Sequence, residues 1–248
     1  MQDSKYLIFE KDYCLRKAQI PTKSATKIIG ELKKETAQTK YKSILHEYGL
    51  HSFHYGNRDV VKINLEAEHL VIVGDIVDFL CKKSSTLKPT YTFSGKAGEI
   101  AFASTINRLF AAFSLNKRVD VSGSSFIYGG DGGGDFFLGD RVFDIKYRDD
   151  GPSHGMTLDA DFLDRSEDET VLVHTTNITG FKINGLDQYK ASGQVFPIAL
   201  SGWVTVEDFK KKAEKSSSKS FRLDGLNEMK SLLMTVLEDQ IAFERMFV

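Results

Sequence analysis

Two short segments rich in apolar residues flank a short turn between residues 132 and 148, in the sequence GGGDFFLGDRVFDIKYR. Phe143, Asp144, Ile145 and Lys146 alternate between apolar and polar, with the period of two that is typical of β-strands. We predict strands at Asp135–Leu138 and Arg141–Lys146, joined by a two-residue turn with Gly139 at its first central position. In this register the paired residues are Leu138 with Arg141, Phe137 with Val142, Phe136 with Phe143, and Asp135 with Asp144.

Patterns elsewhere predict further elements. Apolar residues at helical spacing favour a helix over Gly95–Phe113, with Ser94 as its N-cap and Glu99 in its early turns. The remaining expectations follow in chain order: one or two helices in 24–48, a strand at 60–65, a helix or strand at 67–80, a strand at 118–122, a Gly/Ser-rich loop at 123–134, a loop at 151–155, strands at 169–175 and 195–204, short helices at 186–191 and 206–212, and a C-terminal helix in 223–248.

Two polar stretches suggest how the chain is divided. Residues 82–89 (KKSSTLKP) are a connector that ends in proline, and residues 215–219 (KSSSK) are typical of a linker. We therefore predict an N-terminal α+β region in residues 1–90, a central region in residues 91–212, and a linker with a C-terminal helix in residues 213–248. Strands bracketed by helices favour an α/β fold with a mixed sheet.

Composition narrows the class of protein without choosing a function. The chain has 248 residues, of which 41% are hydrophobic and 27% charged, as is usual for a soluble globular protein. No apolar run approaches the roughly 18 residues of a membrane span, and residues 1–5 lack the apolar core of a signal peptide. Cys14 and Cys81 show no metal-ligand spacing. We expect a cytoplasmic protein that does not bind membranes.

The predicted hairpin places two carboxylates and a lysine on one face. Directly opposed residues have Cβ atoms about 5 Å apart, and Lys146 points to the same side as Asp144 because it lies two residues further along. Close carboxylates repel each other unless a cation lies between them, and Mg²⁺ prefers oxygen ligands. A lysine beside them can orient an attacking water and balance charge on a phosphate. The alternative is a solvated hairpin face, which the presence of Phe137 and Val142 beside opposed aspartates disfavours.

These residues resemble a known signature. Asp135, a short spacer and Asp144-Ile145-Lys146 are similar to the acidic–x–Lys motif of the PD-(D/E)xK nuclease superfamily, and Glu99 matches the upstream helical glutamate of many members. The resemblance covers roughly residues 91–210. It departs from the pattern at Gly134, where proline is expected, and at Asp144, where glutamate is commoner.

The resemblance implies a restriction-endonuclease-like mixed sheet flanked by helices and a Mg²⁺-dependent deoxyribonuclease in which Mn²⁺ can substitute. Asp135, Asp144 and Glu99 would hold the metal, Lys146 would act in catalysis, and Arg148 would contact a DNA phosphate. Residues 91–212 would be the nuclease core, and the N-terminal region in residues 1–90 would supply substrate recognition. The net charge of −1 does not exclude DNA, because the distribution of charge matters more than its sum.

Alternatives remain open at this point. A type II restriction endonuclease acting on DNA as a homodimer is the leading subtype. A structure-specific resolvase or exonuclease and a non-catalytic DNA-binding module are the rivals. Asp131 is an alternative to Asp135 as the ligand. We assign Asp140 to the turn, His174 to the core, the three lysines at 210–212 to a solvated helix face, and the C-terminal helix to the core, with a dimer helix as its alternative.

Overall fold

The computed structural model describes residues 50–55, 58–65, 67–113, 115, 119, 134–148, 155–177 and 196–246. Asp131, the helices expected in 24–48 and 186–191 and the loop at 123–133 lie outside the described residues, as does all but residue 119 of the strand expected at 118–122. The elements, in chain order, are β1 (Leu50–Tyr55), β2 (Arg58–Leu65), α4 (Ala67–Lys83), α5 (Pro89–Ala112), β3 (Phe136–Leu138), β4 (Arg141–Arg148), β5 (Gly155–Asp159), α7 (Ala160–Arg165), β6 (Val171–Asn177), β7 (Phe196–Thr205), α9 (Val206–Lys212), β8 (Glu214–Lys215), β9 (Ser220–Asp224) and α10 (Met229–Met246).

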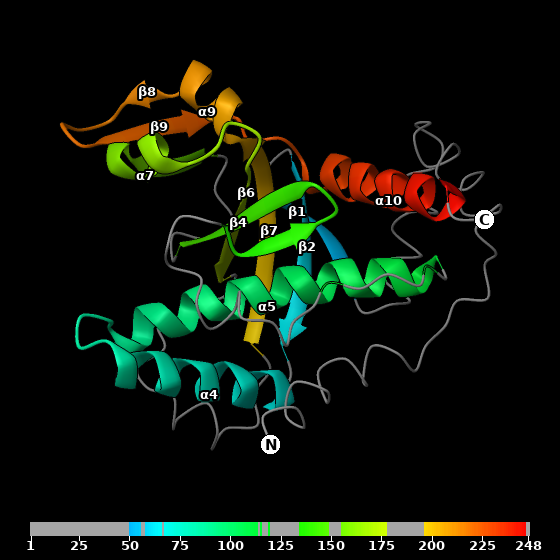
Figure 1. Cartoon of the computed structure of the whole chain (residues 1–248), viewed down its shortest axis with the longest axis horizontal. Helices are drawn as coiled ribbons and strands as arrows, with labels where there is room; N and C mark the ends of the chain where they lie inside the picture. The colour runs from blue at the N-terminus through cyan, green and yellow to red at the C-terminus, as the bar shows by residue number, and fades with distance from the viewer. Residues whose placement is uncertain are drawn as a thin grey trace.

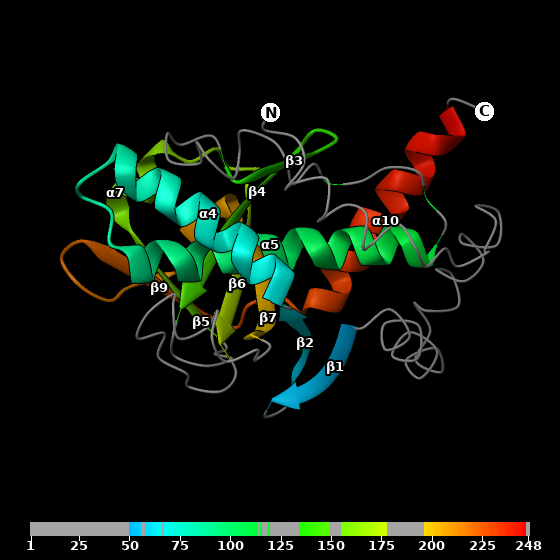
Figure 2. The ribbon, with the colours of Figure 1, turned by 90° about the horizontal axis from the view of Figure 1, so that it is seen from below.

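The main sheet is mixed, as predicted. Its six strands follow the order β1-β2-β7-β6-β4-β3, in which β4 and β6 are parallel and the other neighbours are antiparallel. Helix α5 crosses this sheet. Helix α4 lies beside the N-terminal half of α5, and α10 lies near its C-terminal end (Figures 1 and 2). Apolar side chains of all three helices and of five strands (β2, β3, β4, β6 and β7) form one core, in which Phe93, Phe102, Phe110 and Phe143 are almost fully buried.

A smaller sheet, of order β5-β9-β8, lies with α7 and α9 around a second core. Leu172 of β6 and Val204 of β7 contribute to this second core, whereas Val171 and Val173 contribute to the first. Successive strand residues point to opposite faces, so β6 is buried on both sides. This explains why Val171, Leu172 and Val173 are three apolar residues in a row.

Three expectations about element boundaries were wrong. Helix α5 begins at Pro89, with Lys88 as its N-cap, because proline is well suited to the first helical position. Ser94 therefore lies inside the helix and Glu99 lies beyond its early turns. Residues 215–219 are no linker, since β8 and β9 form a hairpin there in which Ser216 and Ser217 bond to Ser220. The C-terminal helix begins at Met229.

Two other expectations are confirmed: residues 206–212 form α9, and the apolar side of α10 lies in the core. Residues 67–80, for which the sequence left helix and strand open, are helical. The expected division at residue 90 does not separate the described residues, because β2 pairs with β7 and both sides of residue 90 share one sheet and one core. None of the described helices is long and apolar enough to span a membrane.

Helix α5 approaches β6 closely at one glycine. A Cβ atom built on Gly98 would lie 2.5 Å from Oγ1 of Thr175, which is shorter than any real contact of this kind. A Cβ built on Gly95 of the same helix would meet nothing within 4 Å. Because Gly98 has no side chain, α5 can lie directly against the sheet at this point, and the neighbouring Glu99 is brought close to the sheet with it.

These two glycines form a matched pair for a stability test. Gly98→Ala should lower the free energy of unfolding by about 1–3 kcal/mol, because the added methyl group overpacks the contact with β6. Gly95→Ala should instead raise it by about 0.5–1 kcal/mol, since alanine restricts the unfolded chain and has open space here. Denaturant unfolding measures both.

Thr175→Ala should restore most of the stability lost in Gly98→Ala, because it removes the Oγ1 atom that the new methyl group meets. Equal effects of the two glycine substitutions would contradict a close approach at residue 98.

Candidate active site at the β3–β4 hairpin

The hairpin has the predicted register. Phe136 pairs with Phe143, Phe137 with Val142, and Leu138 with Arg141, around a turn in which Gly139 has a φ of 61°. The backbone N–H of Asp135 donates to the carbonyl of Phe143 at 2.7 Å, so the contact between the two strands continues one residue beyond β3. The predicted pair Asp135–Asp144 is not among the paired positions, but the two carboxylates lie close enough for the charge of Asp144 to act on Asp135.

Aromatic packing fixes the hairpin on α5. The rings of Phe136 and Phe143 lie 5.9 and 5.3 Å, between centroids, from the ring of Phe102. Both hairpin rings are buried, whereas Phe137, which alternation places on the other face, is 63% exposed. The apolar side of the hairpin thus joins the main core, whereas alternation along β4 places Asp144 and Lys146 on the face opposite to Phe143 and Ile145.

The departure from the superfamily pattern before Asp135 has a conformational reason. Gly134 has a φ of 80°, and a Cβ atom built on it would lie 2.3 Å from Cγ1 of Val142. Proline is confined to a φ near −65° and cannot adopt this conformation. Glycine at this position allows the backbone to turn so that Asp135 enters the hairpin next to Asp144.

Asp135 is buried and held by the backbone. Its side chain is 8% exposed, and its Oδ2 accepts a hydrogen bond of 2.7 Å from the N–H of Ile145. The bond fixes one carboxylate oxygen against β4. This N–H belongs to the residue between the two charged positions of the Asp144-x-Lys146 motif.

Asp144 and Lys146 form an ion pair on the half-buried face of β4. The Nζ atom of Lys146 lies 2.7 Å from Oδ1 of Asp144 and 3.8 Å from the centroid of the Phe162 ring in α7. A lysine ammonium over an aromatic face is stabilised by the charge distribution of the ring. Phe162 was not among the predicted site residues. Its contact with Lys146 is a tertiary contact between the second core and the hairpin, which no local pattern in the sequence indicates.

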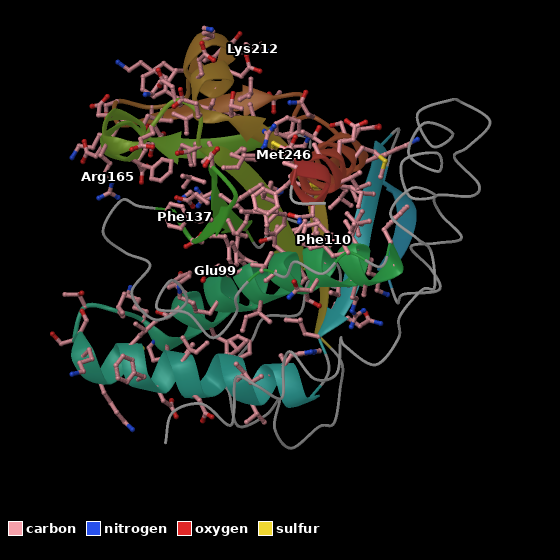
Figure 3. The ribbon with its side chains drawn as sticks, turned by 45° about the vertical axis from the view of Figure 1, so that its right-hand side comes forward. Glu99, Phe110, Phe137, Arg165, Lys212 and Met246 are labelled. Carbon is pink, nitrogen blue, oxygen red and sulfur yellow. The ribbon has the colours of Figure 1, made fainter. Side chains whose placement is uncertain are left out.

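Glu99 reaches the site from α5, on the side of the helix that faces the hairpin (Figure 3). It is 6% exposed, and its Oε1 and Oε2 accept hydrogen bonds of 2.9 and 2.7 Å from Nζ of Lys96. Lys96 is equally buried and was not predicted. Its position three residues before Glu99 is the signal that sequence reasoning could have used, since such residues are neighbours on a helix.

The acidic groups perturb one another. Burial raises the pKa of Glu99 well above its usual value, and the charge of Asp135 raises it further. Burial and the nearby charge of Asp144 raise the pKa of Asp135 to about 6, although Lys96 and Lys146 oppose this effect. Glu99, Asp135, Asp144, Lys96 and Lys146 are thus one electrostatic cluster, with three acids and two bases. Perturbed acids concentrated in one place are typical of functional sites.

The other sequence candidates lie outside this cluster. Asp140 is an exposed turn residue, and His174 is fully buried with its ring bonded to Ser201. Lys210, Lys211 and Lys212 pair with Asp168, Glu207 and Asp208, respectively, on the exposed side of α9, which confirms a solvated face. Arg148 donates a hydrogen bond of 2.7 Å to the carbonyl of Thr157, and its role toward DNA stays a prediction.

The three acids have the right chemistry for a hard divalent cation but are not yet arranged around one. In the described part of the chain, no group of three or more His, Cys, Asp or Glu side chains is placed so that it could hold a metal ion. Lys96 is bonded to both oxygens of Glu99, and the Ile145 N–H is bonded to one oxygen of Asp135. Carboxylate oxygens are nevertheless the preferred ligands of Mg²⁺.

Comparison of the chain with models of protein families, with curated proteins and with solved structures finds no match. The case for a function therefore depends on the residues and geometry of the hairpin and of α5.

The raised pKa of Asp135 predicts a dependence of stability on pH. Its ordinary value is 3.8 and its value in the folded protein is about 6. The carboxyl group of Asp135 loses its proton at a lower pH in the unfolded chain than in the folded protein. Its contribution to the free energy of unfolding therefore favours the folded state most below about pH 4. That contribution is lost as the pH rises through about 6. The difference between the two pKa values corresponds to about 3 kcal/mol.

We therefore expect Asp135→Asn, measured in EDTA by denaturant unfolding, to gain up to about 3 kcal/mol relative to the parent between pH 4 and pH 8. Asparagine keeps an oxygen that can accept from Ile145 but does not ionise. Asp140→Asn, in the exposed turn, is the control and should show no such gain. If the difference in free energy of unfolding between Asp135→Asn and the parent stays constant from pH 4 to pH 8, the pKa of Asp135 is not raised in the folded protein.

Proposed function

We propose that this protein is a metal-dependent nuclease that hydrolyses DNA phosphodiester bonds, with a restriction-endonuclease-like core. The observation that carries this proposal is the convergence of Glu99 from α5 on Asp135, Asp144 and Lys146 of the hairpin. These residues resemble the superfamily signature and come from two elements that are separated along the chain. Among the subtypes, the resemblance favours a type II restriction endonuclease.

Asp135, Asp144 and Glu99 would hold one or two Mg²⁺ ions. When bound, such an ion polarises the phosphate and lowers the pKa of a coordinated water, which makes hydrolysis feasible near neutral pH. The protein supplies the fixed positions of the ligands: the Ile145 N–H orients Asp135, and aromatic packing against Phe102 holds the hairpin on α5.

Lys146 would stabilise the negative charge that develops on the phosphate and position the attacking water. Its ammonium is held at one place by Asp144 and by the Phe162 ring, so little reorganisation is needed during the reaction. Arg148, two residues further along β4, would contact a neighbouring phosphate of the DNA.

A purely structural origin of the cluster is disfavoured by its cost. Buried like charges destabilise a fold, and apolar residues of similar size would stabilise it better. A DNA-binding module without catalysis would gain nothing from two adjacent aspartates, which repel the phosphates of its ligand. The raised pKa values of Glu99 and Asp135 are consistent with a site that is kept for its chemistry.

Cleavage of DNA should require a divalent cation that prefers oxygen ligands. Incubation of the protein with supercoiled plasmid should give nicked or linear DNA with Mg²⁺ or Mn²⁺ and little cleavage with Ca²⁺. Asp135→Asn and Asp144→Asn should each lower the rate by about 10²-fold or more, whereas Asp140→Asn should cut like the parent.

The products separate the subtypes. Discrete bands indicate a sequence-specific restriction endonuclease, and a smear or a preference for branched or broken DNA indicates a resolvase or exonuclease. Binding without cleavage would favour the non-catalytic module. Full activity in excess EDTA would contradict the metal-dependent mechanism, and loss of cleavage in Asp131→Asn with retention in Asp135→Asn would mean that Asp131 is the ligand.

Lys146→Ala should lower the cleavage rate by about 10²-fold or more, as loss of one electrostatic stabiliser does, while DNA affinity and the fold stay nearly unchanged. Single-turnover cleavage and binding to DNA in Ca²⁺ measure the two quantities separately. Lys212→Ala, on the exposed side of α9, is a matched control for the removal of a lysine. A parental rate in Lys146→Ala would assign Lys146 to a merely structural ion pair.

A further inference from the structure

Lys96 is a buried cation within the acid cluster. It is 6% exposed, and lysine is almost never this buried unless it is paired. Its Nζ lies 2.9 and 2.7 Å from the two oxygens of Glu99, so the ammonium bridges the carboxylate. The charge of Lys96 also lowers the pKa of Asp135 in the hairpin.

A cation that bridges both oxygens of a carboxylate occupies the position that a metal ion takes when the carboxylate is a bidentate ligand. Ca²⁺ and related ions bind carboxylates in this way, through oxygens only. Lys96 therefore takes up part of the coordinating capacity of Glu99 in the metal-free protein. It also neutralises one of three neighbouring negative charges, which would otherwise repel one another.

We infer that Lys96 is a built-in competitor of the divalent cation: its ammonium holds Glu99 in the metal-free site and must give up this carboxylate when the ion binds. This inference rests on the proposed function, since it concerns the same site. In this role Lys96 keeps the three acids together before the metal arrives, and it lowers the affinity of the site for the metal.

Neutral substitutions of Lys96 should strengthen metal binding. They remove a positive charge that is bonded to a carboxylate which would hold the ion, and close unit charges interact strongly even at an effective dielectric constant of about 20. We expect Lys96→Met and Lys96→Gln to bind Mn²⁺ at least about tenfold more tightly than the parent. Both should be less stable than the parent in EDTA, because the acids are then less compensated.

The experiment is a calorimetric titration of the metal-free protein with MnCl₂, together with denaturant unfolding in EDTA. Methionine matches the unbranched shape of the lysine stem, whereas glutamine keeps an N–H donor for Glu99, so one variant serves if the other does not fold. Lys212→Met is the control, because Lys212 is exposed on α9, far from Glu99 (Figure 3), and its loss should leave Mn²⁺ affinity unchanged.

Parental or weaker Mn²⁺ binding in both Lys96 variants, with binding intact in the parent, would overturn the inference and leave the proposed function in place. In that case Lys96 would be a structural partner of Glu99, or would position it as a ligand. Failure of the parent itself to bind Mn²⁺ would overturn the proposed function and this inference together.

Discussion

The packing of α5 against the β3–β4 hairpin is the contact on which the candidate site depends. Phe102 of the helix packs against the buried rings of Phe136 and Phe143, and Gly98 lets the helix approach the sheet. Because side chains in a core are close-packed, this contact leaves little freedom for the charged residues beside it. Glu99 is brought to the two aspartates as a consequence of apolar packing, against the repulsion between their charges.

The cluster illustrates a conflict between stability and chemistry. Three carboxylates share a largely buried space, and burial and mutual repulsion raise the pKa of two of them. Two lysines offset the repulsion, one bonded to Glu99 and the other to Asp144. The arrangement leaves one excess negative charge when all five groups are ionised, and a small divalent cation would more than balance it. Sites that are costly to the fold are usually kept for their function.

The two cores of the protein meet near this site. Strand β6 contributes Val173 to the main core and Leu172 to the second one, so it connects them through its two faces. On the second side, Phe162 of α7 lies against the ammonium of Lys146. The smaller sheet therefore does more than extend the fold, because one of its helices helps to fix the lysine that we place in catalysis.

The sequence by itself determined the hairpin, because strand alternation and a Gly-containing turn are local properties that leave one register in which Phe136 and Phe143 are both buried. It also indicated Glu99, through resemblance. Only the tertiary structure decided that Lys96 bridges the two oxygens of Glu99, that Phe162 covers Lys146, and that β1 and β2 belong to the same sheet as the hairpin. These contacts join segments far apart in the chain or depend on which helix face is buried. Side-chain packing across the whole fold sets them, and a local pattern does not contain that information.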